Sequence, residues 1–169
     1  MVGRFNLDLK VMKLDTTSTL SDGPSLSRAS LKPRLATAKD VPRILEMAKD
    51  FFSRSVYSGV EYDEEAVRVL VEHLLEDGCV FVNERGFIAG ALVPLLFAPQ
   101  FLIAQEVAWW APAGGGRELR TMFEDWAEAM GARAVQMSTL SNANAAKLAS
   151  NLSENGYTPV EIQYLKAIN

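Results

Sequence analysis

The chain has 169 residues, enough for one domain with a tail, and 49% of them are hydrophobic, which excludes a wholly disordered protein. The net charge of −4 argues against a nucleic-acid-binding protein, because such proteins usually carry a surplus of basic residues. With a single cysteine and a single histidine, the sequence offers neither a disulfide framework nor a site built from Cys and His ligands. We therefore expect no metal.

The hydropathy pattern indicates a protein that does not cross a membrane. The longest apolar stretch, residues 86–97, is about a dozen residues long and contains Pro94, whereas a membrane span needs about 20. Residues 1–13 alternate apolar and charged side chains and lack the apolar centre of a signal peptide. We expect a cytoplasmic protein.

The N-terminal segment differs from the rest of the chain. Apolar and polar residues alternate over residues 4–11, with a period of two that predicts a strand. Residues 15–30 are rich in Ser and Thr and are typical of a linker, so residues 1–30 are expected to form an arm and residues 31–169 the main domain. Because a lone strand cannot bury its apolar face, we expect residues 4–11 to add to a sheet edge of their own domain, of a second copy or of another protein, and so to mediate self-association or partner binding. A frayed tail with chance alternation is the alternative.

In the first half of the main domain, the sequence predicts a strand, then two helices, then two strands. Residues 41–52 carry an apolar stripe at helical spacing, with Pro42 in the first turn. A second helix is expected between a capping Asp63 and Gly78. The strands are expected at residues 34–37, 79–84 and 87–97, with turns at residues 85–86 and 98–100.

The second half alternates strands and helices. The pattern predicts strands at residues 101–110 and 132–138, helices at residues 117–130 and 142–154, and a final strand region at residues 156–167. The order β-α-α-β-β-β-α-β-α-β indicates a mixed α/β (α+β) domain.

The most informative feature is a strand, a glycine loop and a helix in succession. Gly114, Gly115 and Gly116 leave backbone N–H groups uncovered, and the N-terminus of the following helix directs its positive end to the same place. Arg117 adds a cation there. Together they favour a site for a diphosphate, with a merely flexible turn as the alternative. Neither a Walker loop nor a dinucleotide fingerprint is complete.

The order of elements resembles the GNAT superfamily of acyl-CoA-dependent N-acyltransferases. Residues 34–40 look like its opening strand and helix start, and Gly114, Gly116 and Leu119 fit its G-x-G/A-x-x-L pyrophosphate loop. Further matches are Glu124, Trp126-Ala127, Gly131-Ala132, Asn144, Leu148, Gly156-Tyr157, Tyr164 and Lys166. The resemblance covers roughly residues 31–168 and implies a central, mixed but mostly antiparallel sheet flanked by helices.

The resemblance also implies an activity, which is direct transfer of an acetyl group from acetyl-CoA to a primary amine. The acceptor would be a small molecule or a protein, and acetyl-CoA would lie along strand 101–110 and the glycine loop. The residues assigned to acetyl-CoA are Trp109, Trp110, Ala111, Gly114, Gly115, Gly116, Arg117 and Asn144.

Glu106 is the candidate catalytic base, because it lies mid-strand near the reacting end and a half-buried carboxylate there would have a raised pKa. The alternative is a Glu106 that faces solvent or pairs with a cation. Tyr57 and Tyr62 lie in the loop that walls the acceptor pocket in this family, so they are candidate substrate contacts. Trp109 and Trp110 should face opposite sides of their strand, and one of them should be in the core.

Two departures from the family pattern keep a second interpretation open. Ala111 stands where the pyrophosphate motif opens with Gln or Arg, and Leu152 stands where many members have a general-acid Tyr. A catalytically silent GNAT-fold structural or assembly protein is the alternative to the enzyme, and a CoA-binding regulator is a third interpretation.

Overall fold

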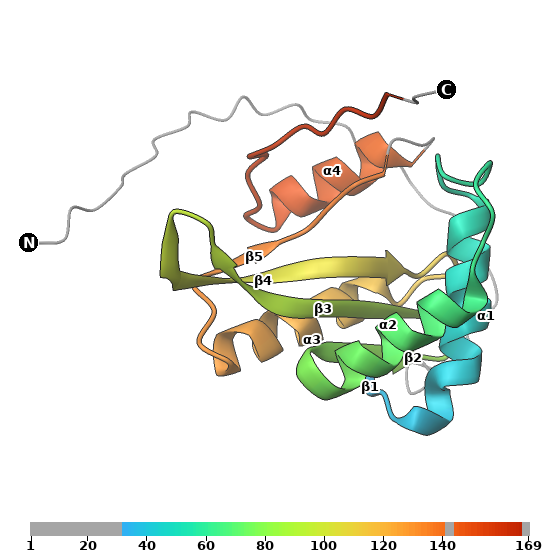
Figure 1. The fold of residues 1–169 in the computed structure, drawn as a ribbon. Helices are drawn as coiled ribbons and strands as arrows, with labels where there is room; N and C mark the ends of the chain where they lie inside the picture. Colours follow the sequence, from blue (N-terminus) through green and yellow to red (C-terminus); the bar gives the residue numbers. More distant parts are fainter. Residues whose placement is uncertain (1–31, 141–143, 167–169) are drawn as a thin grey trace, which may run out of the picture.

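The computed structural model describes residues 32–140 and 144–166. Within them a five-stranded sheet has the order β1-β2-β3-β4-β5 (Figure 1). Neighbouring strands from β1 to β4 are antiparallel, and β5 pairs with β4 in parallel. The strands are β1 (Arg34–Leu35), β2 (Cys79–Asn83), β3 (Gly86–Leu95), β4 (Ala98–Trp110) and β5 (Ala134–Gln136). The expected N-terminal arm lies outside the described residues.

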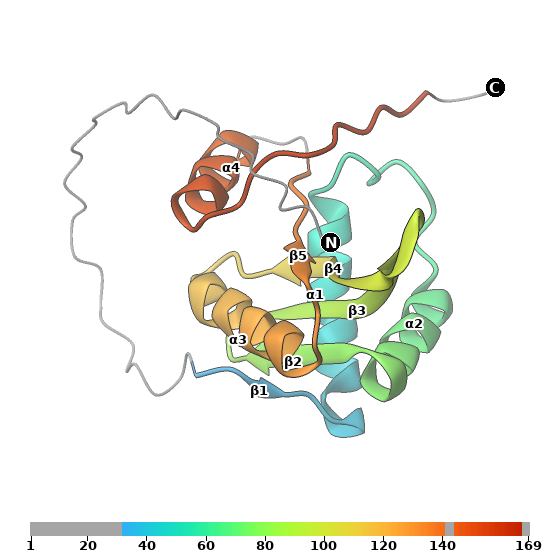
Figure 2. The ribbon, with the colours of Figure 1, turned by 90° about the vertical axis from the view of Figure 1, so that its left-hand side faces the viewer.

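Helices cover both faces of the sheet, so the domain has three layers (Figure 2). One face carries α1 (Val41–Ser53), entered through a 3-10 turn (Ala38–Asp40), and α2 (Glu64–Asp77). The other face carries α3 (Gly116–Ala129). The last helix, α4 (Ala145–Glu154), lies beyond β5 (Figures 1 and 2).

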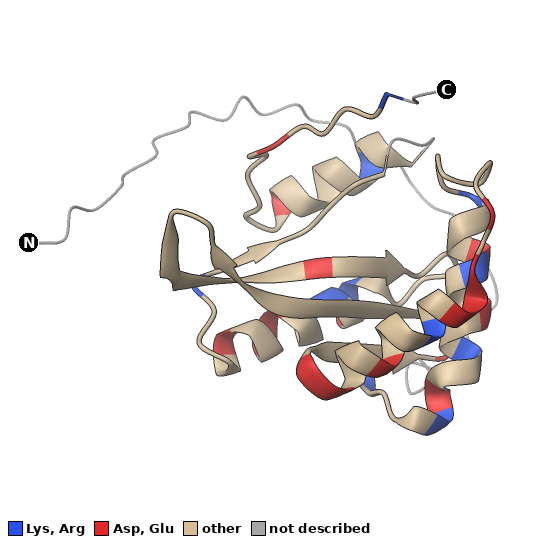
Figure 3. Ribbon diagram, viewed as in Figure 1, with Lys and Arg blue, Asp and Glu red and all other residues tan. Residues whose placement is uncertain are grey.

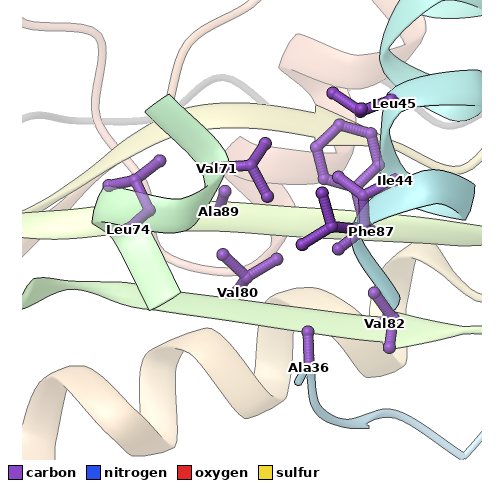
Figure 4. Close-up of a cluster of buried hydrophobic side chains, with 10 residues drawn as sticks. Ala36, Ile44, Leu45, Val71, Leu74, Val80, Val82, Phe87 and Ala89 are labelled. Carbon is purple, nitrogen blue, oxygen red and sulfur yellow. The ribbon is translucent and has the colours of Figure 1, made fainter. Parts of the chain in front are cut away.

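Two apolar clusters, one on each face of the sheet, hold these layers together. Ile44 and Leu45 of α1 and Val71 and Leu74 of α2 pack against alternate residues of β2 and β3 in the first cluster (Figure 4). In the second cluster, α3 contributes side chains that are completely buried against the opposite residues of the same strands. Its buried members are Cys79, Phe81, Ile88, Ala104, Leu119, Phe123 and Ala127. Removal of apolar surface from water is favourable by about 25 cal/mol per Å². Because both clusters are apolar, their burial stabilises the fold.

The predicted helices begin and end where local chemistry favours it. Asp63 accepts a hydrogen bond of 3.0 Å from the backbone N–H of Ala66 at the start of α2. Pro42 lies in the first turn of α1, where its missing N–H costs no helical hydrogen bond. α2 ends at Gly78, as expected, and a Cβ there would lie 2.5 Å from the carbonyl oxygen of Gly90.

Several boundaries differ from the sequence-based expectation. The first strand has only two residues, and the turn between β3 and β4 lies at residues 96–97, so the residues expected to turn are already part of β4. Gly116 belongs to α3 and not to the loop before it.

The predicted final strand is wrong, because residues 156–166 form no strand. A strand needs a partner for its backbone hydrogen bonds, and this segment pairs with no strand of the described chain. The apolar residues that suggested the strand are exposed.

Two features are absent from the described residues. None of the helices among them is long and apolar enough to span a bilayer. Nor do the residues in ranges 32–140 and 144–166 bring three His, Cys, Asp or Glu side chains together as metal ligands would be.

Candidate active site at the end of β4

The glycine loop and the start of α4 are brought to the same end of the molecule by strand direction. β4 and β5 are parallel, so their C-terminal ends lie at one end of the sheet. The strands pair only through Ile103–Gln105 and Ala134–Gln136 and then diverge (Figure 1). α3 follows β4, and Asn144 precedes α4 after β5. This opening between diverging parallel strands is the kind of place where ligands bind to open α/β sheets.

The glycine loop has a backbone that only glycine adopts readily. Gly114 and Gly115 have φ angles of 95° and 83°, in the left-handed region. Gly115 is the N-cap of α3, and no side chain caps the helix. The N–H groups of its first turn therefore remain available for an anion, and Arg117 beside them is exposed. Such an arrangement can hold a diphosphate.

The β2–β3 turn anchors the glycine loop through hydrogen bonds. The sequence alone does not reveal this contact. The Asn83 side-chain amide donates to the Gly115 carbonyl oxygen at 3.2 Å, and the Arg85 guanidinium donates to the Ala113 carbonyl oxygen at 2.9 Å. Asn83 also accepts from the Arg85 backbone N–H at 2.8 Å. Both residues are about 30 positions from the loop in sequence, so only the pairing of β3 with β4 brings them there.

A bulge in β4 determines which side chains face this loop. Ala89 pairs with Ala108 and Gly90 with Glu106, so Val107 is an extra residue on β4. The bulge reverses the alternation of side chains: Ala104 belongs to the α3 cluster, whereas Ala108 packs against the α1 cluster. Glu106 shares the α3 face with its partner Gly90, whose missing side chain makes room for the Phe123 ring.

Glu106 is the only charged residue in strands β2 to β5 (Figure 3 shows how few charges the sheet carries). Its side chain is buried, with 9% exposure, at the point where β4 and β5 diverge. Ser138, just beyond β5, donates to Glu106 Oε2 from its backbone N–H at 3.0 Å and from its hydroxyl at 2.8 Å. Burial raises the pKa of Glu106, although both hydrogen bonds from Ser138 oppose the shift.

Trp109 and Trp110 face opposite sides, as predicted. Trp109 packs with the α3 cluster, and a Cβ on Gly116 would lie 3.2 Å from its ring, so the ring lies directly under the glycine loop. The face of the sheet that α3 covers thus carries Glu106, Trp109 and Gly116, in chain order. Trp110 instead packs on α1, with its ring centroid 5.4 Å from that of Phe51. The structure does not bring Trp110 to the α3 face, where Trp109 and Ala111 lie.

The two predicted acceptor contacts differ in their surroundings. Tyr57 is exposed in the loop between α1 and α2. Tyr62 packs its ring 5.1 Å from that of Phe52, and its hydroxyl is buried without a hydrogen-bond partner among the described residues. Burial raises the Tyr62 pKa, with the Glu64 charge acting in the same direction. Tyr57 is therefore the more accessible of the two.

Leu152 is buried in α4 and can neither donate nor accept a proton. The nearby Tyr157 hydroxyl donates to Glu124 Oε1 at 2.8 Å, and burial together with that carboxylate raises the pKa of Tyr157 well above its usual value. Tyr157 therefore stays protonated and is held by Glu124. Glu106 remains the one titratable side chain at the divergence of β4 and β5 in the described part of the chain.

A hollow of about 310 Å³ lies elsewhere, near the start of α1. It is lined by Arg34 and Asp40, which form a 2.6 Å ion pair, and by Arg43, which donates to the Glu84 carbonyl oxygen. Because Arg34 and Asp40 pair with each other and Arg43 binds a backbone carbonyl, we do not assign the hollow to the site.

The sequence matches no protein-family model and no curated protein. Solved structures do resemble it. A putative acetyltransferase from Agrobacterium tumefaciens aligns over 81% of this chain and 99% of its own, with a TM-score of 0.60 and 15% identity. A transcriptional regulator from Bacillus halodurans aligns over the same shares, with a TM-score of 0.61 and 15% identity. The aminoglycoside N-acetyltransferase AAC(6')-Iy in complex with CoA aligns over 81% of this chain and 93% of its own, with a TM-score of 0.61 and 10% identity.

A second structure of AAC(6')-Iy, in complex with the bisubstrate analogue CoA-S-monomethyl-acetylneamine, aligns over 82% of this chain and 97% of its own, with a TM-score of 0.61 and 10% identity. These likenesses confirm the GNAT-like fold that the sequence predicted. At such low identity they show the fold alone.

Proposed function

We propose that the protein is an N-acetyltransferase that transfers the acetyl group of acetyl-CoA directly to a primary amine. The observation that carries the proposal is Glu106, a lone buried carboxylate on the same face of β4 as the glycine loop. Direct transfer requires a site that holds the anionic CoA and a base that takes the proton of the amine. β4 carries the base and leads directly into the anion site. The acetyltransferases among the structures of similar fold, including the one solved with CoA, support this proposal over a silent scaffold.

The first turn of α3 and the loop before it would hold the diphosphate of acetyl-CoA through backbone N–H groups, with Arg117 adding a charge. Ala111 lacks the side chain that opens the family's motif. Arg85, which already contacts the loop at Ala113, supplies a second cation beside it. Acetyl-CoA, when bound, supplies an activated acyl group at its thioester.

Glu106 removes the proton from the attacking amine, directly or through a water. Both hydrogen bonds from Ser138 end on Oε2, so Oε1 is the oxygen that takes the proton. The raised pKa makes Glu106 a stronger base than an exposed carboxylate, while it is still ionised when the pH exceeds that pKa. Trp109, whose ring lies against Gly116 on the same face of β4, would limit access of water to the loop.

We propose a small-molecule amine as the acceptor. Support comes from one structure of similar fold, the aminoglycoside N-acetyltransferase AAC(6')-Iy, which is solved with the bisubstrate analogue CoA-S-monomethyl-acetylneamine. The acidic residues after Tyr62 give weaker support for a cationic acceptor, because Asp63 caps α2, Glu64 lies 3.8 Å from Lys49 and Glu65 lies 3.4 Å from Arg68.

Two measurements in sequence test the proposal. Calorimetric titration with acetyl-CoA should give saturable binding, whereas a silent scaffold would give none. Release of free thiol from acetyl-CoA should then depend on an added amine from a panel of polyamines, amino sugars and amino acids. Binding without amine-dependent thiol release for any amine in the panel would contradict the enzyme and leave a CoA-binding regulator.

A further inference from the structure

The segment that follows β5 is tied to β4 through the Glu106 side chain. The last residues that pair between the two strands are Gln105 and Gln136, and the strands diverge beyond them (Figure 1). Two residues past this pair, the Ser138 backbone N–H donates to Glu106 Oε2 at 3.0 Å, and the Ser138 hydroxyl donates to the same oxygen at 2.8 Å. A backbone N–H that has left the ladder thus finds its acceptor in a side chain of β4.

The two oxygens of the Glu106 carboxylate have different surroundings. Oε2 accepts both hydrogen bonds from Ser138, and Glu106 makes no other hydrogen bond or ion pair with the described residues. Oε1 therefore keeps its lone pairs for a proton. Glu106 itself is buried, whereas Ser138 is exposed, so the pair runs from the interior of the domain to its surface.

We propose that Ser138 is a positioning residue, which fixes Glu106 Oε2 and thereby leaves Oε1 to take the proton of the acceptor amine. The inference rests on the proposed function, in which Glu106 is the base. The terminal torsion of a Glu side chain is broad, so a carboxylate without fixed partners presents either oxygen. Two donors on one oxygen remove this freedom, because hydrogen bonds to a carboxylate are roughly twice as strong as neutral ones. Ser138 thus acts through Glu106.

The same contact affects the pH at which Glu106 can act. Burial raises the pKa of Glu106, and the two hydrogen bonds from Ser138 lower it. The neighbouring β3, β5 and residues 137–140 carry no charged side chain, and α1 packs on the opposite face of the sheet. Arg120, the one buried charge of α3, pairs with Glu124 and contacts α4. Loss of the Ser138 hydroxyl should therefore raise the pKa of Glu106 further.

The pH dependence of kcat for amine-dependent thiol release tests the proposal. Ser138→Ala removes the hydroxyl and keeps the backbone N–H. The midpoint of the profile should move up by about half to one pH unit, because a hydrogen bond that favours the ionised carboxylate is lost. The kcat reached above the midpoint should fall by about tenfold, because the carboxylate is held less firmly, while the KM of acetyl-CoA stays the same.

Two further variants are the controls. Ser138→Thr keeps a hydroxyl and should restore the wild-type midpoint. Thr139→Ala removes a neighbouring exposed hydroxyl that makes no hydrogen bond with the described residues, so it should leave kcat and the midpoint unchanged. An unchanged midpoint for Ser138→Ala, or an equal shift for Thr139→Ala, would overturn the proposal.

Thermal unfolding separates this inference from the proposed function, because it needs no substrate. Ser138→Ala should lower the melting temperature more near pH 8 than below pH 4.5, where the carboxyl is protonated. This pH dependence should vanish when Ser138→Ala is combined with Glu106→Gln. Absence of thiol release with every amine would contradict the proposed function, whereas an effect of Ser138→Ala on melting that is the same at both pH values would contradict the role of Ser138.

Discussion

Glu106 makes the folded protein sensitive to pH. Burial raises its pKa above the ordinary value of 4.5, so the folded state is penalised once the carboxyl ionises. The native state retains the proton more strongly than the unfolded state, and stability therefore falls as the pH rises from about 4.5 through the raised pKa. Below 4.5 the carboxyl is protonated in both states and the penalty is absent.

Glu106→Gln should therefore stabilise the protein near pH 8 and have no stabilising effect below pH 4.5, the ordinary carboxyl pKa. The amide keeps an oxygen that can accept both hydrogen bonds from Ser138. Thermal unfolding of both proteins across this pH range measures the difference. A Gln variant that is less stable than the wild type at pH 8 would show that the charged carboxylate is favoured at this position and that its pKa is not raised.

Gly115 offers a separate test of the diphosphate site. Gly115→Asp should weaken acetyl-CoA binding by about 2 kcal/mol or more, because it places a carboxylate against the N–H groups at the start of α3. Gly115→Asn is the control, since Asn has nearly the same shape as Asp and tolerates the left-handed backbone about as well as Asp does. Calorimetry gives both dissociation constants. Equal affinities for the Asp and Asn variants would remove the loop from the binding site.

At the scale of elements, Arg120 fixes α4 against α3. This arginine is only 3% exposed and donates to Asn151 at 3.2 Å and to Asn155 at 2.7 Å. Arg120→Met should cost about 1–3 kcal/mol of folding free energy, because it removes both hydrogen bonds to α4 and the 3.2 Å ion pair of Arg120 with Glu124. In the Arg120→Met variant, amides of residues 145–154 should exchange faster than in the wild type, whereas those of β2 should exchange at the wild-type rate. Arg117→Met, on the exposed side of the same helix, should leave stability unchanged within about 0.5 kcal/mol. Equal effects of the two substitutions would contradict this role for Arg120.

The helices could be predicted from the sequence because their signals are local. Asp63 and Gly78 bound α2, and an apolar stripe marks α1, without reference to any other element. The strand predicted at residues 156–167 is wrong, because its alternating pattern is local whereas a strand also needs a partner elsewhere in the chain. The bulge at Val107 is equally hidden, since an alternating pattern does not show where one strand has an extra residue.

The candidate site was predicted only in part, for the same reason. Glu106 and the glycines stand out in the sequence by residue type and position. The contacts of Glu106 with Ser138 and of the loop with Asn83 and Arg85 join residues about 30 positions apart, and only strand pairing reveals them. Trp110 followed the predicted alternation but packs on α1, because α1 covers that face of the sheet.

At the scale of the whole molecule, the arm predicted at residues 1–30 is expected to take no part in acetyl-CoA binding. The candidate site, from Glu106 to the start of α3, is built from residues of the main domain. Deleting residues 2–28 should therefore leave the dissociation constant of acetyl-CoA unchanged within about twofold, a free-energy difference below ~0.5 kcal/mol. Calorimetry on the full and shortened chains measures it. A large loss of affinity in a folded, shortened chain would place the arm in the site.

The most direct test of the account is the rate at which Glu106→Gln releases thiol from acetyl-CoA with an amine that the wild type accepts. If Glu106 is the base, the rate should fall by about 10²–10⁴-fold, the usual contribution of a positioned base, while the dissociation constant of acetyl-CoA stays nearly the same. The remaining rate should no longer rise with pH through the pKa of Glu106. A Gln variant with full activity and the wild-type pH profile would contradict the account, because the proton of the amine would then be removed without Glu106.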